Sequence, residues 1–363
     1  MNQSIAVVGA GVVGAGTAWH LAQCGYSVCL YDPRLGAAVD SDQINGNRNG
    51  TSASLGVLMG HVYRRHSGRG WRLRQRSMAL WPQWIKALQT FEPDLRLQSP
   101  LIQLADDDDV LKRMQGLVER RKGLGLQLIP AMDNPVPCLG GLSSLRDGRL
   151  EPLMLQRALR LAMATVSVQQ HPAKVRNLKR TGTNGDPRWR VETGEESCQD
   201  YEAVVICTAL NSDGLLAPLG HERPMTPVLG QVIDLELKDG PSNWKNWPAV
   251  LSFQGFNLVP KQPGRLLLGA TLEPGAEADP SALKLMLDRL GSTLPWLKSA
   301  TPVEQWWGLR ARPVDRPAPL LEQLEPGLLL ASGHYRNGVL LAPATAEWVQ
   351  KGLNRSSARF TSS

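Results

Sequence analysis

A glycine-rich turn near the N-terminus is the feature that most restricts the fold of this chain. The apolar run Ile5–Val8 leads into Gly9–Gly14, whose sequence GAGVVG has the spacing Gly-x-Gly-x-x-Gly, and a helix-forming stretch follows it. At such a turn the first glycine permits a tight bend, the second lets a pyrophosphate approach the backbone, and the third lets the helix pack closely on the sheet. The turn therefore predicts a βαβ unit that binds a dinucleotide.

An acidic residue at the expected distance supports this prediction. The second apolar run, Val28–Tyr31, ends at Asp32, where a carboxylate accepts hydrogen bonds from ribose hydroxyls and repels a 2′-phosphate. An ordinary strand-to-helix turn would explain the glycines alone, but not their combination with a strand, a helix and this acid. The pattern does not distinguish FAD from NAD. The dinucleotide contacts that it predicts are Gly9, Gly11, Val12, Val13, Gly14 and Asp32.

Composition and charge limit the class of protein. The chain has 363 residues, of which 42% are hydrophobic, so it can bury the cores of two domains and is not disordered. Its net charge of +7 suits an anionic partner, such as a phosphate-bearing cofactor, a carboxylate substrate or nucleic acid. The chain lacks a Cys-x-x-Cys pair, a basic leader and an apolar run of about 18 to 20 residues. We therefore expect a soluble cytoplasmic protein with reduced thiols and no membrane partner.

Strand and helix patterns of the nucleotide-binding type occupy both ends of the chain, and a β-rich block lies between them. Short apolar runs separated by Pro and Gly turns predict successive strands over residues 231–270, and a last helix is expected over 338–351. We therefore expect an α/β fold in which a discontinuous Rossmann-like domain is interleaved with a β-rich (α+β) substrate domain. The expected boundaries are 1–80, 150–225 and 305–352 for the first domain, 81–149 and 226–304 for the second, and 353–363 for a flexible tail.

Several stretches resemble the FAD-dependent D-amino acid oxidase family, most closely the glycine oxidases of thiamine biosynthesis. The segment Gly333–Pro343, with the sequence GHYRNGVLLAP, is similar to the last flavin-contacting segment of that family. Thr51–Leu58, TSASLGVL, is similar to the loop beside the flavin, and Trp307–Arg310, WGLR, also matches. The resemblance extends from Ile5 to about Val349 and implies that the dinucleotide is FAD.

The resemblance also implies further cofactor contacts. They are Pro33, Thr51, Ser52, Leu55, Gly56, Val57, Val175, His334, Tyr335, Arg336, Asn337, Gly338, Val339 and Leu340. The glycine-containing turn that opens the last helix would present backbone N–H groups and the positive end of the helix dipole to a reduced flavin. A simple helix cap is the alternative interpretation of that turn.

Arg310 is the expected carboxylate-binding residue. On a strand it shares a face with Trp306 and Gly308, so its guanidinium would lie beside an aromatic wall and a gap left by the glycine. The carboxylate-binding arginine of the family falls at this position, and Arg336 is a second candidate that the family motif implies. A surface or ion-pairing arginine is the alternative interpretation of Arg310.

The resemblance implies oxidative deamination of a small amino acid or secondary amine that bears a carboxylate, of the glycine, sarcosine or D-amino acid type. A hydride passes from the substrate Cα to flavin N5, the imine hydrolyses, and O2 or another acceptor reoxidises the flavin, with H2O2 as the product of O2. Such an enzyme mainly positions a neutral amine, so no catalytic residue is assigned. A homo-oligomer is compatible with these features.

Three positions depart from the family pattern. Asn257 stands where glycine oxidases carry a tyrosine that helps to hold the carboxylate, and its shorter amide can still donate. Ala209 replaces a glycine at a point where the backbone approaches the cofactor, and Ala311 replaces a proline that commonly follows the arginine. We therefore expect a remodelled substrate pocket with Asn257 among the substrate-binding residues.

Other interpretations remain open. A dehydrogenase of the same fold would pass electrons to another acceptor, and an RNA-modifying flavoprotein, a flavin-binding protein without turnover and an NAD-dependent dehydrogenase are further alternatives. The six arginines over residues 64–76 would suit nucleic acid, but a solvated face or neutralisation of the cofactor is the preferred interpretation. Asp106–Asp109 precede a helix and are expected to act as dipole partners, and no metal site is expected.

Overall fold

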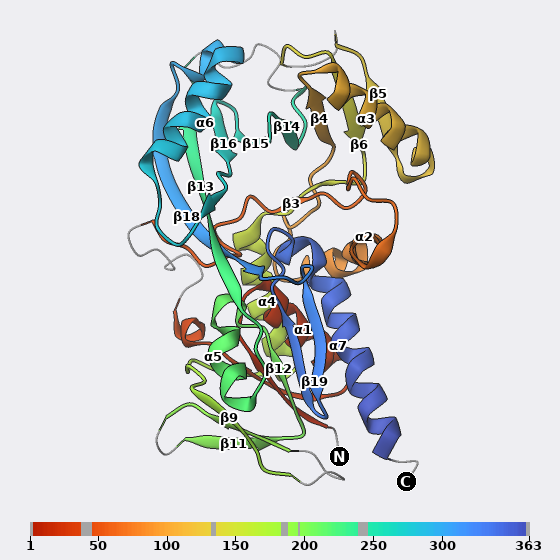
Figure 1. Cartoon of the computed structure of the whole chain (residues 1–363), viewed down its shortest axis with the longest axis vertical. Coiled ribbons are helices and arrows are strands. Elements are labelled where there is room, and N and C mark those ends of the chain that lie inside the picture. Colours follow the sequence, from red (N-terminus) through yellow and green to blue (C-terminus); the bar gives the residue numbers. More distant parts are fainter. Residues whose placement is uncertain are drawn as a thin grey trace.

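The structure, a computed structural model, describes residues 3–37, 46–131, 136–182, 188–194, 197–238 and 246–360. Two large sheets dominate it (Figure 1). The six-stranded sheet and its helices form the lower part of the view, and the nine-stranded sheet forms the upper part. Segments of the two parts alternate along the chain, which confirms the expected interleaving of an α/β part with a β-rich part.

The six-stranded sheet is parallel except at one edge. Its strands lie in the order β19 (Leu320–Glu325), β20 (Leu328–Ser332), β12 (Ala203–Ile206), β1 (Ser4–Val8), β2 (Ser27–Tyr31) and β8 (Gln169–His171). β19 runs antiparallel to β20, and the other neighbours are parallel. Because side chains alternate across a strand, Ile5 and Val7 of β1 face one hydrophobic cluster, whereas Ala6 and Val8 face another.

Helices and a small sheet cover the two faces of this sheet. The first cluster takes residues from α1 (Val12–Gln23), α2 (Gly68–Leu88), α4 (Pro152–Thr165) and α7 (Gly338–Phe360). The second packs against α5 (Ser212–Leu216) and an antiparallel sheet of β9 (Asn177–Arg180), β10 (Trp189–Glu192) and β11 (Cys198–Tyr201). With both faces covered, the carboxyl ends of the parallel strands are where ligands bind in folds of this type.

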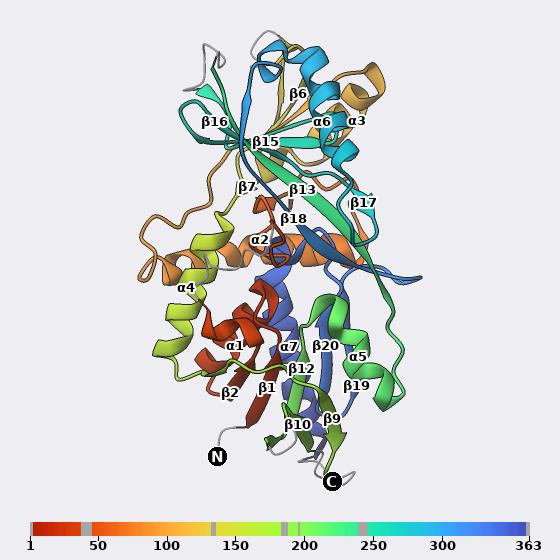
Figure 2. The same cartoon turned by 90° about the vertical axis from the view of Figure 1, so that its left-hand side faces the viewer.

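The nine-stranded sheet makes up most of the β-rich part. Its strands lie in the order β17 (Glu273–Pro274), β13 (Met225–Glu236), β16 (Arg265–Gly269), β15 (Phe256–Gln262), β14 (Val250–Phe253), β4 (Leu101–Ala105), β6 (Gly140–Ser144) and β5 (Leu126–Ile129), and β18 (Thr301–Pro313) pairs with β13. The helices α3 (Asp108–Arg120) and α6 (Pro280–Thr293) pack on it, and β3 (Val57–Leu58) pairs separately with β7 (Gly148–Arg149). The long antiparallel pair of β13 and β18 extends from this sheet toward the lower part (Figure 2).

Three expected boundaries differ from the structure. The border between residues 80 and 81 falls inside α2, because Trp84 and Leu88 pack in the same cluster as α1. The border between residues 304 and 305 falls inside β18. The last helix does not end at residue 351 but continues to Phe360, since Leu353 still packs in that cluster. The division into two domains, with these borders adjusted, stays a prediction.

The acidic run before α3 has the local role that we expected. Asp107 caps the helix by accepting a hydrogen bond from the Val110 N–H at 2.6 Å. Within the described ranges, no group of His, Cys, Asp and Glu side chains is arranged to hold a metal ion. The same ranges contain no helix whose length and apolar character would let it span a membrane. All five cysteines are free.

Candidate active site

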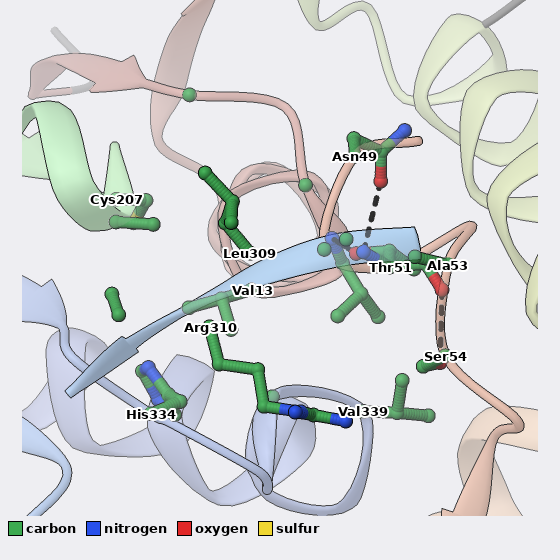
Figure 3. A pocket seen from close by; sticks show the side chains of 18 of the residues that line it. Val13, Asn49, Thr51, Ala53, Ser54, Cys207, Leu309, Arg310, His334 and Val339 are labelled. Carbon is green, nitrogen blue, oxygen red and sulfur yellow. Dashed lines mark hydrogen bonds between the residues drawn. The ribbon is translucent and has the colours of Figure 1, made fainter. Parts of the chain in front are cut away.

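A cavity of about 1700 Å³ lies where the two parts of the molecule meet. Its wall combines the turn after β1, residues 47–57, the end of β18 and residues 331–339, which lead into α7. These segments are far apart in the sequence and come together only in the fold (Figure 3). The volume exceeds that of a pocket for one drug-sized ligand, so a dinucleotide and a small substrate fit together.

The glycine turn opens α1 toward this cavity. Gly9 has a φ of +102°, a backbone conformation that favours glycine. A Cβ on Gly14 would lie 1.8 Å from the Gly9 carbonyl oxygen, so only a glycine lets the helix start this close to the strand. Gly11 supplies no side-chain cap, and the first turn of α1 contains no acid. The positive end of the helix dipole therefore remains available to an anion.

Asp32 follows β2 at the edge of the cavity, where backbone donors hold its carboxylate. Its Oδ2 accepts a hydrogen bond from the Ala10 N–H at 2.8 Å, and its Oδ1 accepts one from the Arg34 N–H at 2.9 Å. The carboxylate keeps further lone pairs for ribose hydroxyls. Of the described residues that line the cavity, Asp32 is the single carboxylate, whereas nine are arginine or lysine. The cavity therefore favours anionic ligands.

The loop before β3 braces the glycine turn. Thr51 Oγ1 accepts a hydrogen bond from the Val12 N–H at 3.1 Å. Asn49 Oδ1 accepts hydrogen bonds from the N–H groups of Thr51 at 2.9 Å and Ser52 at 3.0 Å, the first of which is drawn in Figure 3. Sequence reasoning identified Thr51 and missed Asn49. The Asn49 side chain shapes the loop by accepting hydrogen bonds from two backbone N–H groups of the loop.

The segment before α7 contributes a second helix start. His334 is buried, and its Nε2 lies 2.9 Å from Thr345 Oγ1. Burial, with a smaller contribution from the charge of Arg69, lowers the pKa of His334 to about 3, so its ring is neutral. The Asn337 N–H donates to the His334 carbonyl at 3.0 Å, and α7 begins at Gly338 with no acid in its first turn. Two positive helix ends therefore border one cavity, as the sequence predicted.

Arg310 extends from β18 into the cavity (Figure 3). Its Nη1 donates to the carbonyl oxygens of Leu229 at 2.9 Å and Thr271 at 3.1 Å, and the guanidinium has no other partner among the described residues. A Cβ on Gly230 would lie 2.0 Å from Nη2, so the guanidinium lies across the backbone of that glycine. Burial, with a smaller effect of the Arg336 charge, lowers the pKa of Arg310 to about 10. Nε and Nη2 thus remain available for a carboxylate.

The immediate surroundings of Arg310 differ from the prediction. Trp306 does not form an aromatic wall beside it, because Arg48 stacks on the Trp306 ring at 4.1 Å and the indole Nε1 donates to the Ala53 carbonyl at 3.1 Å. The space at Gly308 is filled, since the Ala53 side chain lies 2.3 Å from the position of a Cβ there. The loop that contains Ala53, which is distant in the sequence, covers this part of the strand face. The Arg310 guanidinium lies instead over Gly230 of the paired strand β13.

A buried carboxylate behind Arg310 was not predicted. Glu273 is 8% exposed and accepts hydrogen bonds from Gln231 Nε2 at 3.0 Å, from the Asp279 N–H at 2.8 Å and from Thr271 Oγ1. Thr271 in turn supplies one of the two carbonyl oxygens that hold Arg310. Glu273 is therefore a positioning residue. No spacing in the sequence signals this role, because Gln231 and Glu273 meet only through strand pairing.

The three departures from the family pattern lie together at the cavity. Asn257 lines it, and the Asn257 Oδ1 is buried without a hydrogen-bond partner among the described residues. Ala209 also lines it and has a φ of +50°. This backbone conformation strains an alanine, whereas a glycine adopts it without strain. Ala311 lines the cavity beside Arg310. The expected remodelling thus concerns residues that the fold places around one space.

The fold brings most of the predicted site residues to the cavity. Those that line it are Arg310, Arg336, Asn257, Gly9, Gly11, Val12, Val13, Asp32, Pro33, Thr51, Leu55, Gly56, Val57, Val175, His334, Tyr335, Asn337, Gly338 and Val339. Three predicted contacts, Gly14, Ser52 and Leu340, do not line it. Gly14 permits helix packing, Ser52 helps to shape the loop, and the Leu340 carbonyl accepts a hydrogen bond from Ser77 Oγ at 2.6 Å on the core side.

The arginines over residues 64–76 do not form one surface. Arg64 and Arg74 line the cavity, whereas Arg76 pairs with Glu347 at 2.7 Å. This distribution favours a role for part of the run in binding a ligand of the cavity, rather than a nucleic-acid surface.

Comparisons with known proteins agree with this description. The profile of a family described as FAD dependent oxidoreductase matches residues 4–351. A glycine oxidase from Pseudomonas putida is 28% identical over 366 aligned residues, which cover 96% of this chain and 93% of that protein. The crystal structure of glycine oxidase from Geobacillus kaustophilus has a TM-score of 0.81 at 24% identity and covers 98% of this chain and 95% of its own. The FAD-bound L-α-glycerophosphate oxidase from Mycoplasma pneumoniae has a TM-score of 0.78 at 17% identity, with 98% of this chain and 95% of its own covered.

Proposed function

This chain belongs to the family of FAD-dependent oxidoreductases, and we propose that it catalyses the oxidative deamination of a small amine that bears a carboxylate. The family match confirms the resemblance that the sequence motifs indicated, and FAD is the cofactor. The glycine oxidases among its relatives support a small amino acid as the substrate. With O2 as acceptor, a primary amine, O2 and water give the carbonyl acid, ammonia and H2O2, and an acyclic secondary amine gives a primary amine in place of ammonia.

The residues around the cavity fit FAD. A side chain at Gly14 would fill the space that lets α1 start against the strand, and the start of α1 is free of acids. We propose that this helix start holds the pyrophosphate and that Asp32 holds the ribose next to it. Thr51–Val57 and His334–Val339 line the rest of the cavity and are the proposed flavin contacts.

The observation that carries the proposal is the placement of Arg310. Its Nη1 is fixed by two carbonyl oxygens, so its free edge can hold a carboxylate in one orientation. When bound, FAD would supply the hydride acceptor for the carbon that carries the amine. The charges of Arg310 and Arg336 favour loss of a proton from the bound ammonium group, which frees the nitrogen lone pair to assist that transfer. His334 is neutral and hydrogen-bonded to Thr345, and it holds the segment in place.

The experiment that tests this function is anaerobic titration of the purified yellow protein with glycine. We expect the visible flavin bands to bleach and H2O2 to appear when air is admitted. Arg310→Lys is the matched variant, because it keeps the charge and loses the planar fork, so it should retain flavin and bleach far more slowly.

Each other outcome has a defined meaning. If glycine leaves the flavin oxidised, sarcosine, proline and D-amino acids are tested in turn, and bleaching by one of them supports the function with another substrate. Bleaching without H2O2 in air would favour a dehydrogenase that uses another acceptor. Protein that cannot be reconstituted with FAD, or that no carboxylate-bearing amine reduces, would contradict the proposal.

A further inference from the structure

The cavity contains a second group of cations that the proposed reaction does not use. Arg74 reaches it from α2, and Arg64 reaches it from the segment before that helix. The Arg74 Nη2 donates to Asn337 Oδ1 at 2.9 Å, and its guanidinium carbon lies 4.0 Å from the centre of the Tyr63 ring. These two contacts fix the plane of the guanidinium. Its Nε is buried and has no hydrogen-bond partner among the described residues.

Arg74 borders the same cavity as Arg310 and Arg336. Asn337, which holds Arg74, directly follows Arg336. Arg336 lies close enough to Arg310 for its charge to act on that guanidinium. Arg336 is exposed and has neither an ion pair nor a hydrogen bond within the described part of the chain. Arg310, Arg336 and Arg74 therefore line one cavity. The buried carboxylates of Glu273 and Asp147 act on Arg310 and Arg74 from behind, but neither lines the cavity.

The other charges of the cavity do not balance these three. Asp32, the single carboxylate among the described lining residues, is bound to the Ala10 N–H beside the glycine turn. The pyrophosphate of FAD is assigned to the start of α1, which has its own donors. One substrate carboxylate on Arg310 would leave Arg74 and Arg336 without an anion.

We propose that the substrate is an amine with two carboxylates, one bound by Arg310 and the second by Arg74 with Arg336. Amino dicarboxylic acids and amines with two carboxymethyl groups have this chemistry. The inference rests on the proposed function and specifies its substrate class. Arginine suits this task because its planar fork matches the planar carboxylate, and the contacts of Arg74 with Tyr63 and Asn337 hold that fork in place before the substrate arrives.

Two pairs of compounds of similar shape test the proposal by steady-state kinetics with the FAD-loaded enzyme. D-aspartate is compared with D-asparagine, and iminodiacetate is compared with sarcosine. Each pair keeps the amine and one carboxylate; D-asparagine has a neutral amide in place of the second carboxylate, and sarcosine lacks that carboxylate. We expect kcat/KM to be about tenfold or more higher for the dianionic member of at least one pair, since a hydrogen bond to a charged group contributes at least this much.

Arg74→Gln is the diagnostic variant, and Arg72→Gln is its matched control. Arg72 lies on the same helix, is exposed and does not line the cavity. Its replacement by glutamine lowers the net charge by one unit, as the replacement of Arg74 does. We expect Arg74→Gln to reduce the preference for the dianionic member about tenfold, mainly through KM, and Arg72→Gln to leave that preference as it is. The binding of malonate and acetate can be measured without turnover through the change that each causes in the flavin spectrum. Malonate should bind more tightly than acetate, and Arg74→Gln should narrow the difference.

Three results would overturn the proposal. If the monoanionic members are oxidised as well as the dianionic ones, the substrate class is wrong while the proposed function stands. If Arg74→Gln loses flavin and keeps the preference for the dianion, Arg74 serves the cofactor instead. If no member of either pair reduces the bound flavin, this inference is contradicted, and if glycine, proline and the other D-amino acids also fail, the proposed function is contradicted as well.

Discussion

The nucleotide end and the substrate end of the cavity are built in different ways. At the nucleotide end, Gly9, Gly14 and Asp32 belong to one βαβ unit, and their contacts are made by backbone groups close in the sequence. At the substrate end, Arg310 and Gly230 come from paired strands, and each is placed by residues distant in the sequence. A local backbone motif leaves few residue choices, whereas a site assembled from side chains of several strands can change one residue at a time.

This difference explains where the chain departs from its family. The glycine turn and Asp32 keep the expected pattern, and all three departures, at Asn257, Ala209 and Ala311, line the cavity. Asn257 and Ala311 belong to the substrate end, so they can alter substrate specificity without disturbing the glycine turn, whereas Ala209 stands where the family backbone approaches the cofactor. Separate measurements of flavin content and of catalysis distinguish changes at the two ends.

The largest effect is expected from Gly14→Ala. The new Cβ would lie 1.8 Å from the Gly9 carbonyl oxygen, and backbone cannot move aside as a flexible side chain does. We expect most of the bound FAD to be lost and the free energy of unfolding to fall by about 3 kcal/mol or more. The flavin absorbance per protein molecule measures the bound FAD, and urea unfolding measures the free energy of unfolding. Gly123→Ala, where a Cβ would meet no atom within 4 Å, should change neither.

Arg310→Lys should affect catalysis while the flavin remains bound. Lysine keeps the charge but loses the fork that two carbonyl oxygens hold. We expect kcat/KM to fall about 100-fold, which corresponds to about 2.7 kcal/mol, with unchanged flavin content. Arg190→Lys, in an exposed pair with Asp200, is the control that should have no effect. Loss of flavin in Arg310→Lys would contradict the independence of the two ends.

His334 should make stability depend on pH. Its pKa is about 3 in the folded protein and 6.5 ordinarily, so the unfolded chain takes up a proton first as pH falls. Stability is therefore lost between pH 6.5 and about 3, and the loss from this group between pH 7 and pH 5 is about 2 kcal/mol. Urea unfolding of the wild type and of His334→Gln at both values isolates the contribution, because the other titrating groups are common to both. Equal pH dependence in the two proteins would show that His334 is not buried as a neutral ring.

The smallest expected effect is a stabilising one. Ala209 has a φ of +50°, a conformation that costs an L-residue about 1–2 kcal/mol. Ala209→Gly removes that strain but adds about 0.4–1 kcal/mol of unfolded-state entropy, so a net gain of about 0.5 kcal/mol is expected. Thermal unfolding of the FAD-loaded protein measures it. A destabilised variant would indicate that the Ala209 methyl group packs against the cofactor or the cavity wall.

The sequence alone determined the nucleotide end of this protein. A short strand, three spaced glycines, a helix and Asp32 are neighbours along the chain, so their spacing already implies their geometry. The resemblance in residues 333–343 and 51–58 added the identity of the cofactor and further residues that line the cavity. It also identified Arg310, although not the residues around it.

Only the tertiary structure decided how the substrate end is assembled. Gly230 makes room for the guanidinium, Glu273 positions it through Thr271, and Arg74 joins Arg336 at the cavity. The prediction that Trp306 lies beside Arg310 is wrong for the same reason. Contacts between strands, and between strands and distant loops, depend on pairing register and chain path, and neither is encoded in the spacing of residues along one segment.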